Sequence, residues 1–189
     1  MTVSLLTSCD MTMAVAAIVY DQNDHADRLL AVVARELAQS GVRVGGLVQH
    51  NIRRSSDAPC VMELEDVATG ERYRITQDLG CGSDSCCLDA SMLAEASVAV
   101  RNAIAATTDL VIVNKFGTQE ATGRGLRDEL GQVVAAGIPL LTTVGDHYLE
   151  QWREFTGDAS VLLPASLPAV LNWCSDILKR ALCPLEAVA

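Results

Sequence analysis

The sequence predicts an α/β fold with three layers, in which helices cover both faces of a mostly parallel sheet that carries an inserted antiparallel β-hairpin. Two observations predict this class. Short apolar segments alternate with longer segments whose apolar residues recur at helical spacing, which is typical of strands buried on both faces. Between residues of about 58 and 78, apolar and polar residues alternate instead, which is typical of a hairpin with one solvated face.

The elements of the first half follow in order. A buried strand is expected at Met13–Tyr20, and the apolar residues of Arg28–Gln39 share one face of a helix. A second strand is expected at Val42–Gln49. The hairpin then pairs Cys60–Val67 with Arg72–Gln77.

Strands and helices alternate again in the second half. Asp89 begins a helix that runs to about Ala105. The further expected elements are the strand Asp109–Asn114, the loop Thr118–Gly125, the helix Leu126–Ala136, the strand Ile138–Val144, the helix His147–Thr156, the strand Ser160–Leu163 and the helix Ser166–Leu182.

Length and charge limit the classes of function. The 189 residues suit a single α/β domain over residues 13–183, preceded by a loosely ordered N-terminus at residues 1–12. The net charge of −10 excludes general nucleic-acid binding, which needs clustered basic residues. No apolar run approaches the ~18 residues that span a bilayer, so we expect a cytoplasmic protein without membrane contact, and a homodimer as the default assembly.

Polar side chains follow four of the expected strands. They belong to Tyr20-Asp21, Gln49-His50-Asn51, Asn114-Lys115 and Gly145-Asp146. Ligands of open parallel sheets bind in the crevice outside the carboxyl ends of the strands, so a binding site is expected there.

The joint between the first strand and the first helix is acidic. Asp21-Gln-Asn-Asp-His-Ala-Asp27 has no glycine and no lysine, whereas a phosphate-binding P-loop depends on both. Helix capping is the favoured interpretation of Asp24 and Asp27. Asp21 ends a strand and is a candidate ligand-binding residue together with Asn23.

Several motifs point to a known family. Val44–Arg54 and Glu63–Glu71 resemble the thermophile-type P-loop nucleoside triphosphatases. The chain resembles still more an uncharacterised bacterial family that is often encoded beside molybdate-transport genes. The motifs that carry this resemblance are Val19-Tyr20-Asp21, Gly46–Gln49 with Asn51, Met62–Asp66, Asp78–Gly80 with Cys86-Cys-Leu-Asp89, Ile112–Glu120 and Gly123-Arg-Gly125. The resemblance implies a P-loop-NTPase-like fold with a degenerate Walker A motif, and molybdate or a nucleotide as the ligand, while the residues themselves fix no cofactor.

The acidic pair of those triphosphatases is Asn114-Lys115 in this chain. Because magnesium usually needs a carboxylate ligand, this exchange disfavours ordinary NTP hydrolysis. Lys115 and Arg124 could instead hold an anion. An ion pair between Lys115 and Glu120 that only fixes the loop is the alternative.

The remaining candidates lie near these residues. Gly123 belongs to the same string as Arg124, and Gln49, Asn51 and Arg53 follow the second strand, where they could bind a ligand or only each other. Cys86, with Cys81 and Cys87 beside it, could bind a soft metal, although the C-x4-C-C spacing is no standard zinc pattern and ordinary loop thiols are the alternative.

The sequence leaves three functions open. The first is a non-hydrolytic accessory protein that binds a nucleotide-like or molybdate-type oxyanion ligand in molybdenum metabolism. The second is a nucleoside triphosphatase or phosphotransferase with Lys115 and Arg124 at a non-standard phosphate site. The third is a metal or thiol-redox protein based on Cys86. The sequence leans against an enzyme, and an NTP hydrolase is the expected kind if there is one.

Overall fold

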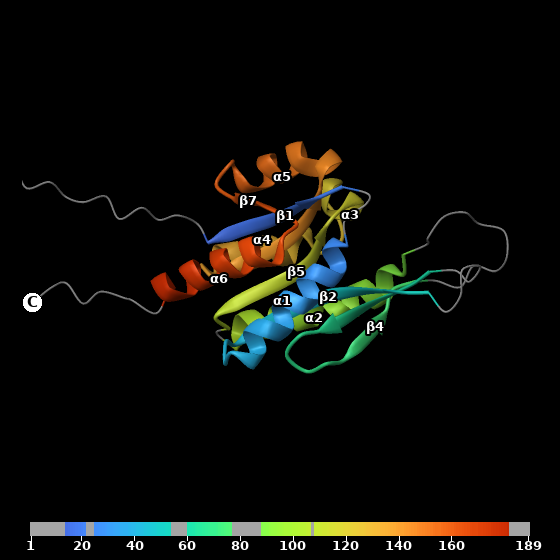
Figure 1. The fold of residues 1–189 in the computed structure, drawn as a ribbon. Helices are drawn as coiled ribbons and strands as arrows, with labels where there is room; N and C mark the ends of the chain where they lie inside the picture. The colour runs from blue at the N-terminus through green and yellow to red at the C-terminus, as the bar shows by residue number, and fades with distance from the viewer. Residues whose placement is uncertain (1–13, 22–24, 54–59, 77–87, 107, 182–189) are drawn as a thin grey trace, which may run out of the picture.

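The computed structural model describes residues 14–21, 25–53, 60–76, 88–106 and 108–181, and they contain a seven-stranded sheet (Figure 1). Its strands lie in the order β4-β3-β2-β5-β6-β1-β7. They are β1 (Val15–Tyr20), β2 (Val44–Ile52), β3 (Val61–Asp66), β4 (Arg72–Arg74), β5 (Leu110–Phe116), β6 (Leu140–Gly145) and β7 (Val161–Pro164). The β2, β5, β6, β1 and β7 strands run parallel, while β3 and β4 are antiparallel and extend one edge of the sheet. The predicted fold class, with its hairpin, is therefore confirmed.

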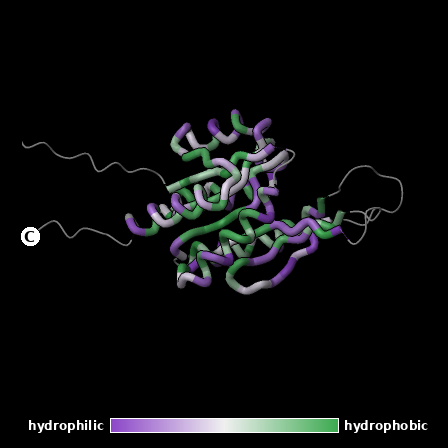
Figure 2. The backbone as a smooth tube through the Cα atoms, viewed as in Figure 1, coloured by the Kyte–Doolittle hydropathy of each residue, from purple (hydrophilic) through white to green (hydrophobic). Residues whose placement is uncertain are grey.

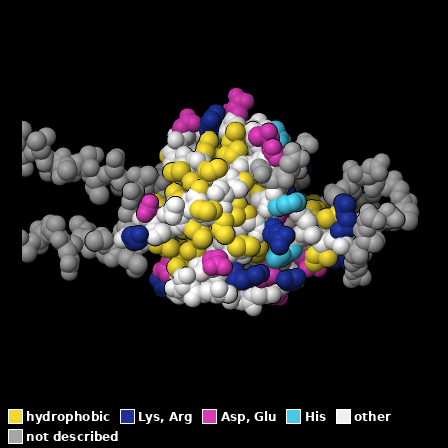
Figure 3. All heavy atoms as spheres, viewed as in Figure 1, with side chains coloured by type: hydrophobic (Ala, Val, Ile, Leu, Met, Phe, Trp, Pro, Cys, Tyr) yellow, Lys and Arg dark blue, Asp and Glu magenta, His cyan; other side chains and the backbone are white. Residues whose placement is uncertain are grey.

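Helices cover both faces of this sheet. On one face, α1 (Ala26–Gln39) and α6 (Leu167–Ala181) pack on a buried cluster that includes Ile18 and Leu141. On the other face, α2 (Ala90–Ala105), α4 (Arg127–Ala135) and α5 (Leu149–Thr156) pack on a cluster that includes Phe116 and Trp152. Figure 2 shows hydrophobic residues along the central strands and on the helix sides that meet them. In the space-filling view of Figure 3, apolar side chains lie between charged ones over α1 and α6.

Two strands run further than the sequence predicts. The β5 strand continues past Asn114 to Phe116, because the Phe116 ring is fully buried against Trp152, with the ring centroids 5.1 Å apart. The β2 strand continues to Ile52, because its last residues pair with β3 instead of β5. A short helix, α3 (Thr118–Ala121), occupies part of the predicted loop, and the 3-10 turn η1 (Asp146–Tyr148) precedes α5.

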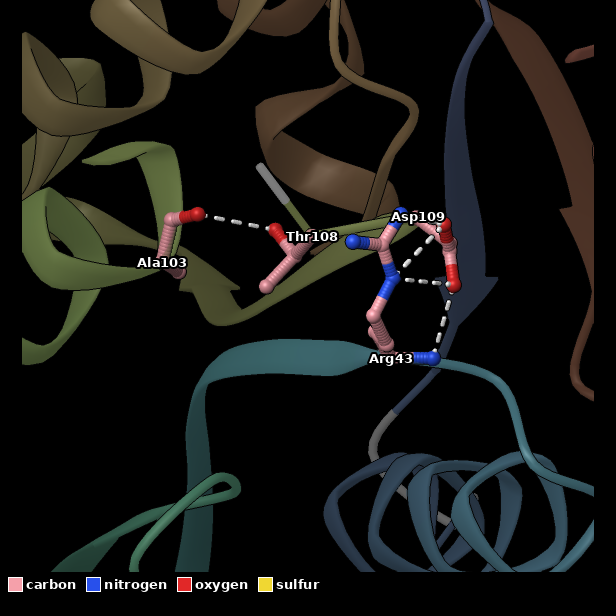
Figure 4. Close-up of polar contacts among 4 residues, drawn as sticks. All are labelled: Arg43, Ala103, Thr108 and Asp109. Atoms are coloured by element: carbon pink, nitrogen blue, oxygen red, sulfur yellow. Dashed lines mark hydrogen bonds and ion pairs between the residues drawn. The ribbon is translucent and has the colours of Figure 1, made fainter. Parts of the chain in front are cut away.

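An ion pair joins the starts of β2 and β5, at the amino ends of the parallel strands (Figure 4). Asp109 accepts hydrogen bonds from the backbone N–H of Arg43 at 2.9 Å and from its guanidinium at 2.6 Å, and these bonds lower the pKa of Asp109. Beside it, the Thr108 hydroxyl donates to the carbonyl of Ala103 at 3.0 Å, which ties the end of α2 to the same edge. These contacts stabilise the end of the sheet opposite to the predicted crevice.

The described part of the chain contains no helix long and apolar enough to cross a membrane. The N-terminus that the sequence predicts to be loosely ordered lies outside the described residues, as do Asn23 and Asp24, and Cys81, Cys86 and Cys87.

Candidate functional site

The four predicted strand ends meet at one edge of the sheet. Tyr20 at the end of β1 pairs with Gly145 at the end of β6, and Phe116 of β5 pairs with Val144 one residue earlier. The β2 strand is aligned with β5 through Leu47 and Val113, so that Gln49 and Asn51 extend toward the same edge. The parallel register therefore forms the crevice that the polar strand ends predict.

A chain of hydrogen bonds crosses this crevice from β2 to β6. Gln49 donates from Nε2 to Asn51 Oδ1 at 2.8 Å, and Asn51 donates from Nδ2 to Asp27 Oδ2 at 2.5 Å. The other oxygen of Asp27 accepts from Asn114 Nδ2 at 2.8 Å, and Asn114 Oδ1 accepts from the Thr143 hydroxyl at 2.7 Å. Asn114 and Thr143 are buried, so these bonds fix the geometry of the crevice floor.

Asp27 is a residue at the centre of the candidate site that sequence reasoning missed. The expectation that it caps α1 is wrong, because His25 is the N-cap residue and Asp27 lies within the first turn with both carboxylate oxygens bound to amides. Its two partners are 24 and 87 residues away in the chain, so no local pattern could indicate them. The available signal was the pair of strand-end amides, the exposed Asn51 and the buried Asn114, whose N–H groups both donate to one acceptor.

Lys115 supplies the cation of the crevice. It is half-buried, and its Nζ lies 6.0 Å from the centroid of the Tyr20 ring. Burial raises the pKa of Tyr20, while the charge of Lys115 and its hydrogen bond to the phenol lower it. Among the described residues Lys115 forms no ion pair with a carboxylate, so its charge is available to a ligand.

Glu120 holds the loop after β5 through backbone groups. Its two carboxylate oxygens accept the N–H groups of Gly117 and Leu126, each at 2.9 Å, and its side chain is buried. Gly125 is required beside it, because a Cβ at that position would lie 2.1 Å from Glu120 Oε1 and the φ angle is +63°. The loop is therefore fixed without the Lys115–Glu120 ion pair that the sequence leaves open.

A cavity of about 210 Å³ lies beside Lys115. The polar part of its lining is formed by Gln49, Asn114, Lys115 and the segment 117–120. The apolar part of its lining is formed by Met62, Leu64, Ile75, Leu88, Leu93 and Leu126. One water molecule takes up about 30 Å³ in the liquid, so this cavity has the volume of several waters. It is larger than a single small oxyanion and could also hold an organic group.

The other predicted site residues lie apart from this cavity. Arg124 is exposed and lines a different cavity of about 450 Å³ between α2 and α4, so the structure does not bring it together with Lys115. Gly123 is exposed in the turn before Arg124 with a φ angle of +81°, and Arg53 is exposed just after β2. Asp21 is exposed at the end of β1.

The metal-site prediction falls on residues outside the described ranges, since Cys81, Cys86 and Cys87 all belong to the segment 77–87. Within the described ranges no group of three or more His, Cys, Asp or Glu side chains could hold a metal ion. Asn23 also lies outside them, so the start of the crevice between β1 and α1 is defined by Tyr20, Asp21 and Asp27.

Comparison with known proteins supports the fold and gives the family. A family model described as "Protein of unknown function (DUF2478)" matches residues 15–173. A protein of Bradyrhizobium diazoefficiens named "Molybdenum import ATP-binding protein ModC 2" is 46% identical over 166 residues, which are 88% of this chain and 18% of that protein. The chain thus spans less than one fifth of the length of that relative.

A solved structure also resembles the chain. It is described as the solution structure of a human cancer-related nucleoside triphosphatase, and the two align with a TM-score of 0.61 and 14% sequence identity. The alignment covers 90% of this chain and 100% of the other. At this identity the likeness concerns the fold, and it confirms the P-loop-NTPase-like architecture predicted from the sequence.

Proposed function

The chain belongs to the DUF2478 family, and from this premise we propose that it is a binding module for a small anion, either a molybdate-type oxyanion or a nucleotide-like ligand, which it holds without hydrolysis. The observation that carries the proposal is the position of Lys115. The Lys115 residue is half-buried and lines a cavity at the carboxyl edge of the parallel strands, and it has no carboxylate partner among the described residues. A cation held in this way can form charge-assisted hydrogen bonds with an oxyanion.

The residues around Lys115 support binding without hydrolysis. The segment 21–27 has neither the glycines nor the lysine of a P-loop, and we propose that it is a degenerate Walker A segment. The Asp27 carboxylate is already bound by two amides, and the strand position that carries acids in the resembled triphosphatases carries Asn114 instead. Few oxygen ligands are left for a magnesium ion that would activate water on a nucleotide.

The proposed role in molybdenum metabolism depends on the relative. That protein is named as a molybdenum import ATP-binding protein, and 88% of the present chain aligns with part of it. We propose that the module binds molybdate, or a nucleotide linked to its transport, in the cytoplasm. The polar and apolar residues that line the cavity suit either a bare oxyanion or an anion carried on an organic group.

Isothermal titration calorimetry with molybdate, tungstate, sulfate, ADP and ATP tests the proposal. We expect at least one of these anions to bind, and Lys115→Ala to weaken that binding by about 10- to 150-fold, the equivalent of one charge-assisted hydrogen bond. Lys179→Ala is the matched control, because Lys179 is exposed on α6 and lies outside the crevice. At about 0.15 M salt the net charge of −10 is screened beyond about 8 Å, so the local cation decides the result.

Two outcomes would overturn the proposal. Heat signals absent for all five anions would remove the binding function. Phosphate release from ATP that disappears in Lys115→Ala but persists in Lys179→Ala would instead establish hydrolysis at a non-standard phosphate site.

A further inference from the structure

A second cavity, of about 420 Å³, lies between the start of α1 and the edge of the sheet formed by β2 and β4. Its lining includes His25 and Arg28 of the α1 start, His50 of β2 and Arg72 of β4. We name these four side chains the basic cluster. Figure 3 shows histidine and basic side chains next to one another on the face that carries these elements. The chain as a whole has 24 acidic and 14 basic residues, yet two of its three histidines and two arginines meet at this cavity.

The two members on the sheet are held in place by acids of β3. Arg72 lies 2.8 Å from Glu65 and 3.5 Å from Glu63, and His50 Nε2 lies 2.9 Å from Glu65 Oε2. The His50 contact does not have the geometry of a hydrogen bond, and its buried Nε2 has no hydrogen-bond partner among the described residues. Half of the Arg72 side chain is exposed, so its guanidinium can still reach a ligand.

The two members on α1 have their charge-bearing groups available. Arg28 and His25 are exposed, and neither side chain forms an ion pair or hydrogen bond within the described part of the chain. The one carboxylate that lines the cavity belongs to Asp27, whose two oxygens accept amide hydrogens from Asn51 and Asn114. The lining therefore carries two arginine charges and one carboxylate that is already hydrogen-bonded. Because Arg72 is paired with Glu63 and Glu65, Arg28 is the arginine of the basic cluster that has no carboxylate partner among the described residues.

We infer that this second cavity, which lies on the β2 side of the crevice, is a binding site for a phosphate group that is separate from the cavity at Lys115. Arginine is suited to phosphate because its planar guanidinium binds two oxygens at once, and Arg28 and Arg72 approach the cavity from different elements. Gln49 lines both cavities, so the two sites adjoin through one side chain. The inference does not depend on a ligand in the crevice, since none of the basic cluster lines the cavity of Lys115.

Titration with inorganic pyrophosphate tests the inference on the full chain. We expect pyrophosphate to bind, and Arg28→Ala to weaken this binding by at least about tenfold, as the loss of one charge-assisted contact requires. Arg35→Ala is the matched control, since Arg35 is exposed on the same helix but does not line the cavity. Lys115→Ala should leave this binding within about twofold of the wild-type value, whereas it should weaken anion binding in the cavity at Lys115 by about 10- to 150-fold.

Each result decides the question. Equal affinities of Arg28→Ala and Arg35→Ala, a loss of pyrophosphate binding only in Lys115→Ala, or no binding to the wild type would overturn the second site. A nucleoside diphosphate that binds more tightly than pyrophosphate, with the same loss in Arg28→Ala, would support the site and assign the phosphate to an organic ligand. Pyrophosphate binding that depends on Arg28, together with no anion binding that depends on Lys115, would support the second site and refute only the proposed function.

Discussion

Replacing Asn114 by aspartate should destabilise the protein strongly above neutral pH. Asn114 is 2% exposed and donates to Asp27 Oδ1 at 2.8 Å, so Asn114→Asp places two carboxylates in contact. The lost bond between amide and carboxylate is worth about 1.5–3 kcal/mol. Two charges with centres about 4 Å apart repel by about 4 kcal/mol at an effective dielectric constant of about 20. The sum of about 5.5–7 kcal/mol is a large part of the stability of an ordinary domain.

The pH dependence of the free energy of unfolding separates repulsion from a simple loss of packing. Because the two carboxylates in contact bind a proton more tightly when folded than when unfolded, the deficit of Asn114→Asp should be largest at about pH 8 and shrink at about pH 5. Asn114→Ala also loses the bonds to Asp27 and Thr143, but its deficit should not change with pH in this way. Urea unfolding of both variants at the two pH values measures the difference.

A second variant tests whether Asp27 is the cause. In Asp27→Asn/Asn114→Asp, the donor and the acceptor exchange places, so an amide again faces a carboxylate and the Thr143 hydroxyl keeps an acceptor. The double variant should recover most of the stability that Asn114→Asp loses at about pH 8. If the double variant loses as much unfolding free energy as the two single variants together, the reasoning is refuted. Identical pH profiles of Asn114→Asp and Asn114→Ala would refute it as well.

Two further predictions concern the core. Gly46→Ala should cost about 3 kcal/mol or more of unfolding free energy, because the φ angle of Gly46 is +105° and a Cβ would lie 2.0 Å from the carbonyl oxygen of Ile112. In the control Gly131→Ala on α4, the new Cβ meets no atom within 4 Å, so this variant should be more stable by up to about 1 kcal/mol. Equal thermal midpoints of the two variants would contradict this prediction. Burial raises the pKa of the Cys174 thiol to about 12, so mass spectrometry should find Cys174 unmodified by iodoacetamide at about pH 8 until urea unfolds the protein; modification of the native chain would show that the thiol is accessible.

The sequence predicts the fold well because hydrophobic periodicity is a local property. The apolar segment that becomes β1 is buried on both faces, and the alternating segments that become β3 and β4 lie at the edge of the sheet. The strand ends are predicted less well. The polar side chain of Lys115 suggests that the strand ends at Asn114. The β5 strand nevertheless continues to Phe116, because the Phe116 ring packs against Trp152 of α5, a contact that exists only in the folded protein.

The sequence predicts that the polar strand ends meet at one edge of the sheet, but not which hydrogen bonds connect them. Parallel strands bring their carboxyl ends together in any fold of this class, so Gln49, Asn51 and Asn114 meet as expected. The acid that joins them comes from the first turn of α1, where a carboxylate has an equally good local role as a cap. Glu120 was a candidate ligand-binding residue, and its buried carboxylate is instead committed to two backbone N–H groups that no sequence pattern places beside it.

The positions of the positive and the negative charge in this chain are the reverse of those in the P-loop triphosphatases that it resembles. There the lysine precedes the first helix and the acids follow the strand, whereas here the carboxylate lies on α1 and the ammonium on β5. The first turn of a helix attracts anions, but Asp27 already places a negative charge there. A bound anion should therefore lie toward the end of β5. If so, Asp27→Asn should tighten anion binding at Lys115, because it removes a neighbouring negative charge while leaving an acceptor for one of the two amides, and calorimetry that shows weaker binding would contradict this reversal.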